Sequence, residues 1–154
     1  MSYEHTLVPV SRSQEAIRKL ILQNGGSAVA FVSQPPREGF EAQLAIDAAT
    51  YRVRIQAEAK PKERKRRRRW GRLPLKDPSE EATKRVWRVL FFHLKSVFEA
   101  SASGVMERRE LLMPYIVTKD GRTIADHILP RLEAAVQGKP ERLLPEKSTG
   151  ATTS

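Results

Sequence analysis

A run of basic residues between Lys60 and Arg72 is the part of the sequence whose residue types imply chemistry most directly. Its thirteen positions hold nine basic residues and one acidic residue, Glu63, so about +8 of the chain's net charge of +10 lies here. Closely spaced like charges repel one another, and they gain free energy when they neutralise phosphates and displace the counterions condensed on them. The planar guanidinium of arginine also binds a phosphate through two hydrogen bonds. The run therefore predicts a binding site for a polyanion, with nucleic acid as the first candidate.

The candidate phosphate-binding residues are the cations of this run, with two neighbouring arginines. The cations are Lys60, Lys62, Arg64, Lys65, Arg66, Arg67, Arg68, Arg69 and Arg72. Trp70 lies among them, where its ring can stack on an exposed base. Arg52 and Arg54 shortly precede the run and are expected to extend the same positive surface. A solvated loop, a localisation signal or an anchor for anionic lipid would have a similar composition.

Asp47, Glu58 and Lys60 support a catalytic alternative. A helix followed by three strands, with Asp47 between the second and third strands and Glu58-Ala59-Lys60 ending the third, resembles the D…ExK pattern of restriction-endonuclease-like nucleases. The resemblance implies that the two carboxylates hold Mg²⁺ and that the lysine helps to position the attacking water. Lys60 is also the first residue of the basic run, so the catalytic and the purely binding interpretations both begin there.

Other residue types limit the available chemistry. The chain has no cysteine, which excludes disulfides, thiolate metal sites and a cysteine nucleophile. His5, His93 and His127 are far apart and lack metal-ligand spacing. Gly25-Gly26 is better explained as a helix stop than as a phosphate-binding loop. No window approaches the roughly 18 apolar residues of a membrane-spanning helix, and the N-terminus lacks the pattern of a signal peptide, so we expect a cytoplasmic protein.

The first predicted elements are a helix and a strand. Ser11 and Gln14 fit a capping box at the start of a helix, which the sequence Asn24-Gly25-Gly26 ends. Residues 27–33 are small and β-branched and are followed by Pro35-Pro36, which is typical of a strand that enters a turn. The basic run is therefore expected to lie on an α+β framework.

A hairpin is predicted at residues 40–57. Residues 40–46 and 51–57 both alternate apolar and polar side chains, and residues 47–50 form a turn between them. Because successive side chains of a strand point to opposite faces, the pair buries one face. Arg52 and Arg54 are then expected on the outward face of the third strand.

A long helix is predicted to begin at Pro78, with acidic residues in its first turn, and to end near Gly104. Its expected core positions are Ala82, Val86, Val89, Leu90, Leu94 and Val97, widened by Trp87, Phe91 and Phe98. Its basic residues would continue the positive surface of the arginine-rich run: Lys84, Arg85, Arg88 and Lys95.

The C-terminal third predicts a short strand, a turn and a last helix. Residues 115–117 predict the strand, and Asp120-Gly121 predicts the turn. Thr123 and Asp126 resemble a helix cap, and the helix is expected to bend at Pro130. Its apolar positions recur every four residues: Ile124, Ile128, Leu132 and Val136.

Two features of the sequence resemble those of known kinds of protein. The stretch from Trp87-Arg88 to Gly104, followed by Pro114-Tyr115-Ile116-Val117 and Asp120-Gly121-Arg122-Thr123, resembles small proteins encoded by bacteriophages and prophages. This resemblance covers less than half of the chain, implies a phage origin and carries no catalytic residue. The α-β-β-β-α order is similar to that of double-stranded-RNA-binding domains, although residues 34–39 lack that family's usual loop motif and the basic run precedes the second helix instead.

These observations predict one α+β domain, a small antiparallel sheet backed by helices. It spans residues 11–138, with an N-terminal segment at 1–10, a basic loop at 60–77 and a disordered tail at 139–154. The expected function is non-catalytic binding of DNA or RNA through the phosphate backbone with little sequence discrimination. The alternatives are a nuclease with Mg²⁺ as its cofactor, and a phage protein that binds an acidic host protein. Outside the nuclease alternative no cofactor is expected.

Overall fold

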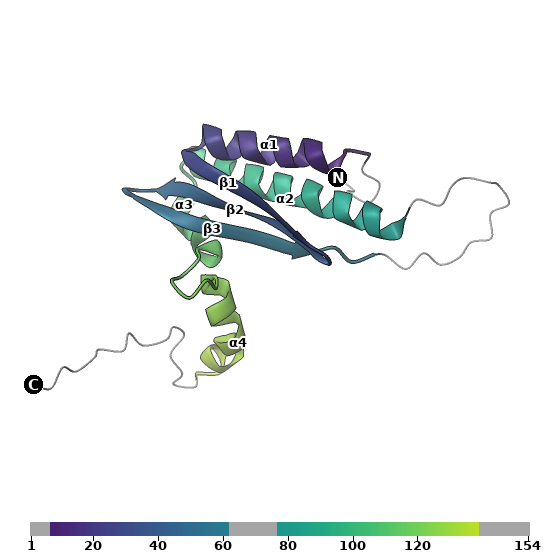
Figure 1. Cartoon of the computed structure of the whole chain (residues 1–154). Coiled ribbons are helices and arrows are strands. Elements are labelled where there is room, and N and C mark those ends of the chain that lie inside the picture. Colours follow the sequence, from purple (N-terminus) through teal and green to yellow (C-terminus); the bar gives the residue numbers. More distant parts are fainter. Residues whose placement is uncertain (1–6, 62–76, 139–154) are drawn as a thin grey trace, which may run out of the picture.

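The computed structural model of the chain describes residues 7–61 and 77–138 and confirms an α+β fold. The predicted tail at 139–154 and most of the predicted basic loop lie outside these residues. The elements, shown in Figure 1, follow in chain order: α1 (Val10–Gln23), β1 (Gly26–Gln34), β2 (Arg37–Ile46), β3 (Ala49–Glu58), α2 (Pro78–Ala102), α3 (Arg108–Leu112), the 3₁₀ helix η1 (Met113–Tyr115) and α4 (Ile124–Val136).

The three strands form an antiparallel sheet in the order β1-β2-β3. In the register of β2 with β3, Phe40 pairs with Ile55 and Ala42 pairs with Val53. All four of these side chains are buried, whereas Gln43 on the opposite face is exposed. The alternation that predicted the hairpin is therefore confirmed, because a strand's side chains change faces at every residue.

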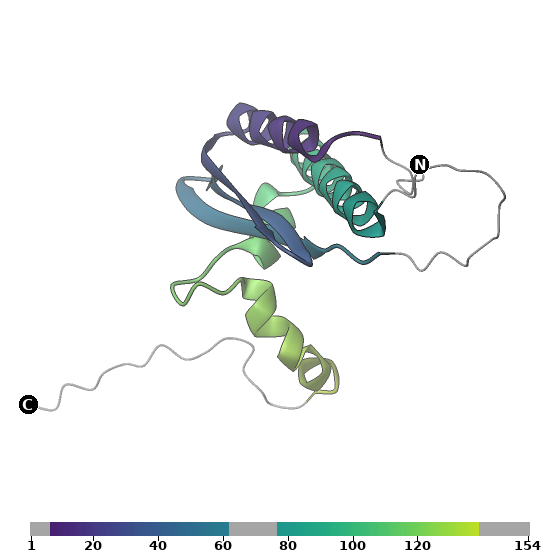
Figure 2. The same ribbon diagram turned by 45° about the vertical axis from the view of Figure 1, so that its right-hand side comes forward.

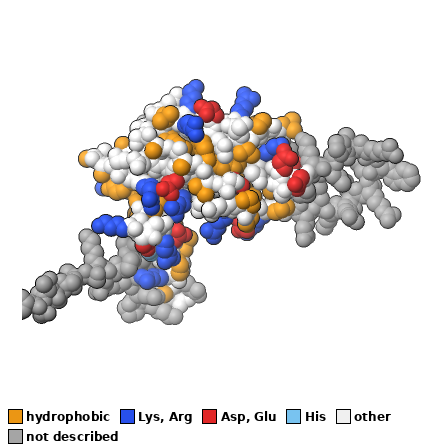
Figure 3. All heavy atoms as spheres, in the orientation of Figure 1, with side chains coloured by type: hydrophobic (Ala, Val, Ile, Leu, Met, Phe, Trp, Pro, Cys, Tyr) orange, Lys and Arg blue, Asp and Glu red, His pale blue; other side chains and the backbone are white. Residues whose placement is uncertain are grey.

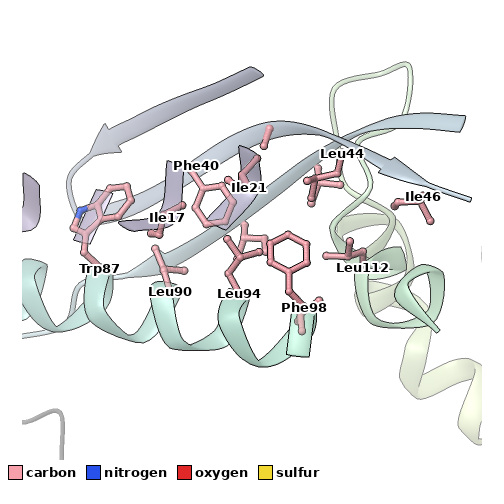
Figure 4. Close-up of a cluster of buried hydrophobic side chains, with 14 residues drawn as sticks. Ile17, Ile21, Phe40, Leu44, Ile46, Trp87, Leu90, Leu94, Phe98 and Leu112 are labelled. Atoms are coloured by element: carbon pink, nitrogen blue, oxygen red, sulfur yellow. The ribbon is translucent and has the colours of Figure 1, made fainter. Parts of the chain in front are cut away.

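Helices α1 and α2 cover the apolar face of the sheet, as both views in Figures 1 and 2 show. The core between these layers is labelled in Figure 4: Ile17, Ile21, Phe40, Leu44, Ile46, Trp87, Leu90, Leu94, Phe98 and Leu112. Each fully buried side chain of this size stabilises the fold by about 1.5–3 kcal/mol relative to an exposed position. This core holds α2, and with it the start of that helix, against the sheet.

Trp87 connects α2 to the first two strands through a polar contact inside the core. Its side chain is fully buried, and its ring packs edge-on against Phe31 with centroids 5.7 Å apart. Its Nε1–H donates to Glu38 Oε2 at 3.1 Å, and Ser33 Oγ donates to Glu38 Oε1 at 2.8 Å. Glu38 is only 3% exposed, so these two donors replace the water that its carboxylate loses on burial.

Local signals set the limits of α2 as predicted. The Asp77 side chain accepts the Ser79 N–H at 2.9 Å and caps the first turn, where Glu80 and Glu81 favour the positive end of the helix dipole. Beyond the last turn, Gly104 adopts a φ of +74°, which L side chains rarely adopt.

Several predictions about local structure are wrong. The capping box at Ser11 does not form, because α1 begins two residues earlier than that box requires: its N-cap is Pro9, which has no side-chain acceptor, and Ser11 lies inside the first turn. Val89, expected in the core, is 41% exposed, and Leu132 and Val136 are 45% and 79% exposed. Periodicity marks one face of a helix but does not show which part of that face another element will cover.

The predicted strand at 115–117 is only partly present. Tyr115 ends η1, and Ile116 and Val117 make isolated bridges rather than a strand. The Val117 N–H donates to Arg52 C=O at 2.8 Å, so this segment covers the outer edge of β3. The predicted cap of α4 is confirmed: the Thr123 N–H donates to Asp126 Oδ2 at 3.0 Å, and the Asp126 N–H donates to Thr123 Oγ1 at 3.1 Å.

Within residues 7–61 and 77–138, no helix is both long enough and apolar enough to pass through a bilayer.

We expect Trp87→Phe to lower the free energy of unfolding by about 1–3 kcal/mol, because it leaves the buried Glu38 carboxylate with one donor fewer. The measurement is urea unfolding followed by circular dichroism. Val89→Ala is the control on the same helix, since its side chain is partly exposed and its loss is expected to change stability by under about 0.5 kcal/mol. Equal stability of the two variants would show that the Trp87 contact is not important for the fold.

Candidate nucleic-acid interface

The described structure contains both attachment points of the basic run. Lys60 lies just beyond the end of β3, where the Ala59 N–H still donates to Pro36 C=O at 2.7 Å. The chain re-enters the described structure at Asp77, the cap of α2. Figures 1 and 2 both place the end of β3 and the start of α2 at the same end of the domain. The sheet and α2 therefore hold both ends of the run at one end of the fold.

Three of the predicted phosphate-binding residues belong to the described part of the chain: Lys60, Arg52 and Arg54. The others lie outside the described residues: Lys62, Arg64, Lys65, Arg66, Arg67, Arg68, Arg69, Trp70 and Arg72.

Lys60 is well placed to exchange its partner for a phosphate. Its Nζ lies 3.7 Å from Glu58 Oε2, and the two side chains are 77% and 52% exposed. An ion pair with this exposure contributes at most about 1 kcal/mol. A phosphate can therefore replace the Glu58 carboxylate at little cost.

Arg52 and Arg54 lie on the sheet face away from α1 and α2, as predicted, but both bind Glu41. Arg52 Nε is 3.2 Å from Glu41 Oε1, and Arg54 Nη2 is 2.9 Å from Glu41 Oε2. Arg54 Nη1 also donates to Gly121 C=O at 2.8 Å, which connects the sheet to the turn before α4. Arg54 thus has a structural role, while Arg52, whose side chain is 47% exposed, is the more accessible of the two.

The pairing with Glu41 was missed in the sequence although a signal was present. The hairpin register places Glu41 directly opposite Arg54 and next to the Gln43–Arg52 pair. Oppositely charged residues that face each other across two strands interact directly. Listing cross-strand partners, rather than only the faces of each strand, would have identified this pair.

Lys84, Lys95 and Arg88, which were expected to extend the positive surface along α2, also have partners. Lys84 Nζ lies 2.6 Å from Glu80 Oε1, and Lys95 Nζ lies 3.7 Å from Glu99 Oε1. Arg88 instead stacks over the rings of Phe91 and Phe92, at 5.1 and 4.6 Å from their centroids. A guanidinium that stacks on a ring keeps N–H groups in its plane that can still donate to a phosphate.

The described body is close to neutral. Residues 7–61 and 77–138 include sixteen basic and fourteen acidic residues, a net charge of +2, whereas residues 62–76 include nine basic and one acidic residue, a net charge of +8. Figure 3 agrees with this balance, since basic and acidic side chains are interspersed on the face it shows. The surplus charge is thus confined almost entirely to the segment between the two attachment points.

The catalytic alternative fails geometrically, because the structure does not bring its three residues together. Asp47 lies in the turn before β3 and Glu58 is the last residue of that strand. Ten residues of strand separate the two ends of β3 by about 30 Å. Asp47 Oδ2 instead lies 3.6 Å from Arg109 Nη1. One Mg²⁺ ion cannot bind both carboxylates at this separation, and the described residues contain no cluster of three potential metal ligands.

A cavity of about 300 Å³ lies beside the end of β3. It is lined by Arg37, Arg54, Gln56, Ala57, Glu58, Tyr115, Thr123, Ala125 and Asp126. Its two arginines are matched by two carboxylates, so the lining does not favour an anion. Hydrogen bonds from Thr123 hold the pKa of Asp126 below its usual value, which keeps that carboxylate charged. This cavity therefore adds no phosphate site to the basic run.

The Asp120 carboxylate stabilises the turn at residues 118–122, whose Gly121 carbonyl accepts a hydrogen bond from Arg54. Asp120 accepts hydrogen bonds from Thr118 Oγ1 and, at 3.1 Å, from the Arg122 N–H, and it lies 3.0 Å from His127 Nε2. These donors, chiefly Thr118, lower the pKa of Asp120 from 3.8 to about 2. The charged form of Asp120 thus stabilises the turn whose Gly121 carbonyl binds Arg54.

No protein-family model matches the chain, and comparisons with curated proteins and with solved structures found no match.

We expect Asp120→Asn to lower the melting temperature at pH 7 and to lose this effect in acid. A carboxylate whose pKa is lowered by folding stabilises the fold above its unfolded-state pKa, and this contribution disappears as the pH falls from about 4 to about 2. The measurement is the melting temperature of wild type minus that of the variant across this range. The exposed neighbour substitution Lys119→Gln is the control, with a difference that stays constant. A constant difference for Asp120→Asn as well would contradict the assigned role.

We expect no Mg²⁺-dependent cleavage of DNA or RNA by the purified protein, because Asp47 and Glu58 cannot share an ion. Asp47→Ala is expected to leave nucleic-acid affinity unchanged, since Asp47 lies outside the basic run and its ion pair with Arg109 is exposed. The measurement is an incubation of labelled duplex and single strands with and without Mg²⁺. Cleavage that requires the metal and is abolished by Asp47→Ala would restore the nuclease alternative.

Proposed function

We propose that the chain is a non-catalytic nucleic-acid-binding protein that contacts phosphates through the run from Lys60 to Arg72. The observation that carries this proposal is the separation of charge: the described body is nearly neutral, and residues 62–76 carry a net charge of +8. A surplus used only for solubility has no need to be concentrated in one segment. A concentrated positive charge gains the most binding free energy from the closely and evenly spaced phosphates of a nucleic acid.

The described residues support a division of roles in this proposal. Within the body, Glu41 forms ion pairs with Arg52 and Arg54. It also fixes both attachment points of the run at one end of the domain. The folded domain then presents the run, and the proposal adds contacts from Lys60, the first residue of the run, and from Arg88 on α2.

Phosphate contacts of this kind carry little sequence information. Trp70, within the run, is proposed as a stacking group for an exposed base, which would add affinity for unpaired strands without a strong preference among bases. The proposed partner is therefore DNA or RNA of many sequences, and the phage origin implied by the C-terminal resemblance is part of the same proposal.

The test is a titration with duplex DNA across a series of salt concentrations. Contacts with about five phosphates predict a slope of log K against log salt of roughly −4.5, because each neutralised phosphate releases counterions. Replacing Arg66, Arg67, Arg68 and Arg69 with Gln is expected to reduce the slope to about −1. Affinity at low salt should fall by several orders of magnitude.

The matched control removes the same charge from the body. Replacing four exposed cations, Arg12, Lys19, Arg109 and Lys119, with Gln gives the same net charge as the run variant but leaves residues 60–72 intact. The control is expected to keep a slope near −4.5. A slope near zero for wild type, or equal losses in the two variants, would contradict the proposal. Protein partners retained by the wild type after nuclease digestion would favour the acidic-protein alternative.

A further inference from the structure

The outer edge of β1 has unpaired backbone groups among the described residues. The Val117 N–H donates to Arg52 C=O, so the backbone groups of Arg52 face away from β2. In an antiparallel sheet, successive residues of a strand direct their N–H and C=O groups to alternate sides, and two paired residues either both face each other or both face away. Arg52 pairs with Gln43, and Gln43 pairs with Ala28. Because Arg52 faces away from β2, Gln43 faces β1. Ala28 therefore faces β2. It follows that three alternate residues direct their N–H and C=O groups outward: Val29, Phe31 and Ser33.

This edge lacks the features that normally prevent two strands from pairing. The nine residues of β1 include no charged residue and no proline, whereas natural edge strands are usually protected by lysine, proline or a covering element. By contrast, Ile116 and Val117 cover the edge of β3. The only irregularity of β1 is a register shift between Gly26 and Ala28, at the end of the strand.

The side of α1 next to this edge has an exposed stripe with one acidic and one basic residue near its middle. Ser11, Glu15, Arg18 and Leu22 follow one another at intervals of four, three and four residues, which places them on one stripe of a helix. The Arg18 guanidinium lies 5.2 Å from the centre of the Phe31 ring, so this stripe lies on the β1 side of α1. All four residues are exposed, and Leu22 is exposed to 54%.

We propose that two copies of the chain associate through this surface, with β1 pairing antiparallel to the β1 of the second copy. A two-fold axis perpendicular to the sheet joins the two sheets edge to edge and places the two α1 helices antiparallel on the same side. When such helices meet about the middle of the stripe, Glu15 faces Arg18 of the second copy, and Arg18 faces its Glu15. Ser11 and Leu22 then lie opposite each other at the two ends.

A second copy fits this surface better than an unrelated strand. The backbone edge alone would accept any extended chain. The helix stripe is more selective, because an antiparallel second copy of it places Arg18 opposite Glu15 and Glu15 opposite Arg18. The two-fold relation supplies the strand ladder and both ion pairs at once. The surface is also distinct from the basic run, which leaves the domain at the end of β3, so dimerisation and nucleic-acid binding are separable.

The test is the solution mass of the full chain across a concentration series, by light scattering or sedimentation, after nuclease digestion and a high-salt wash. Wild type is expected to reach twice the 17.5 kDa of one chain. Glu15→Arg or Arg18→Glu alone places like charges opposite each other and is expected to raise the dimer dissociation constant at least about tenfold. The double exchange Glu15→Arg with Arg18→Glu, or an equimolar mixture of the two single variants, is expected to restore the dimer.

A backbone variant tests the strand contact independently. Val29→Pro removes an outward N–H without breaking a bond to β2, so the monomer is expected to fold while the dimer is lost. Ala30→Pro is the control that removes an inward N–H and is expected to destabilise the sheet itself. The Arg66 to Arg69 variant should dimerise normally. A mass of one chain throughout, or a dimer that neither the charge reversals nor Val29→Pro weakens, would overturn the proposal.

Discussion

The contact between Trp87 and Glu38 determines how the two layers of this fold meet. Trp87 lies about ten residues into α2, and Glu38 lies near the start of β2, opposite Ala57 in β3. A buried carboxylate must keep its hydrogen-bond donors, so the helix cannot slide along the sheet without a large cost. The contact therefore places the start of α2 near the end of β3. This arrangement brings the two attachment points of the basic run to one end of the domain.

The distribution of charge separates the described body, which is nearly neutral, from residues 62–76, which carry a net charge of +8. Within the body, Glu41 holds Arg52 and Arg54, and the lysines at 84 and 95 pair along their helix. These pairs contribute little stability individually, but they leave the surface of the body nearly balanced in charge. A polyanion therefore has one strong point of attraction on the chain. Under the proposed function, the body is the scaffold and the run supplies most of the binding free energy.

The sequence predicted the hairpin and α2 because their signals are local: strict alternation in one case, and a capped amphipathic repeat in the other. The cap at Thr123 was found for the same reason. What could not be predicted depends on tertiary contacts. The segment at 115–117 became a 3₁₀ turn and two bridges at the edge of β3, and Leu132 and Val136 remained exposed because no described element packs on that part of α4. At the candidate site, the pairing of Arg52 and Arg54 with Glu41 follows from the hairpin register and could have been predicted from it. The contacts of Arg54 with Gly121 and of Asp47 with Arg109 join segments that are distant in the sequence, so only the tertiary structure reveals them.

The most direct test of this account is a backbone amide NMR titration of the full chain with a short oligonucleotide at moderate salt. Chemical-shift changes and line broadening are expected to concentrate at residues 60–76, with smaller effects near Arg88, while the amides of β1, β2 and α4 stay unchanged. Strong perturbation of the open face of the sheet, with little change at residues 60–76, would contradict it, because the nearly neutral body would then be the binding surface.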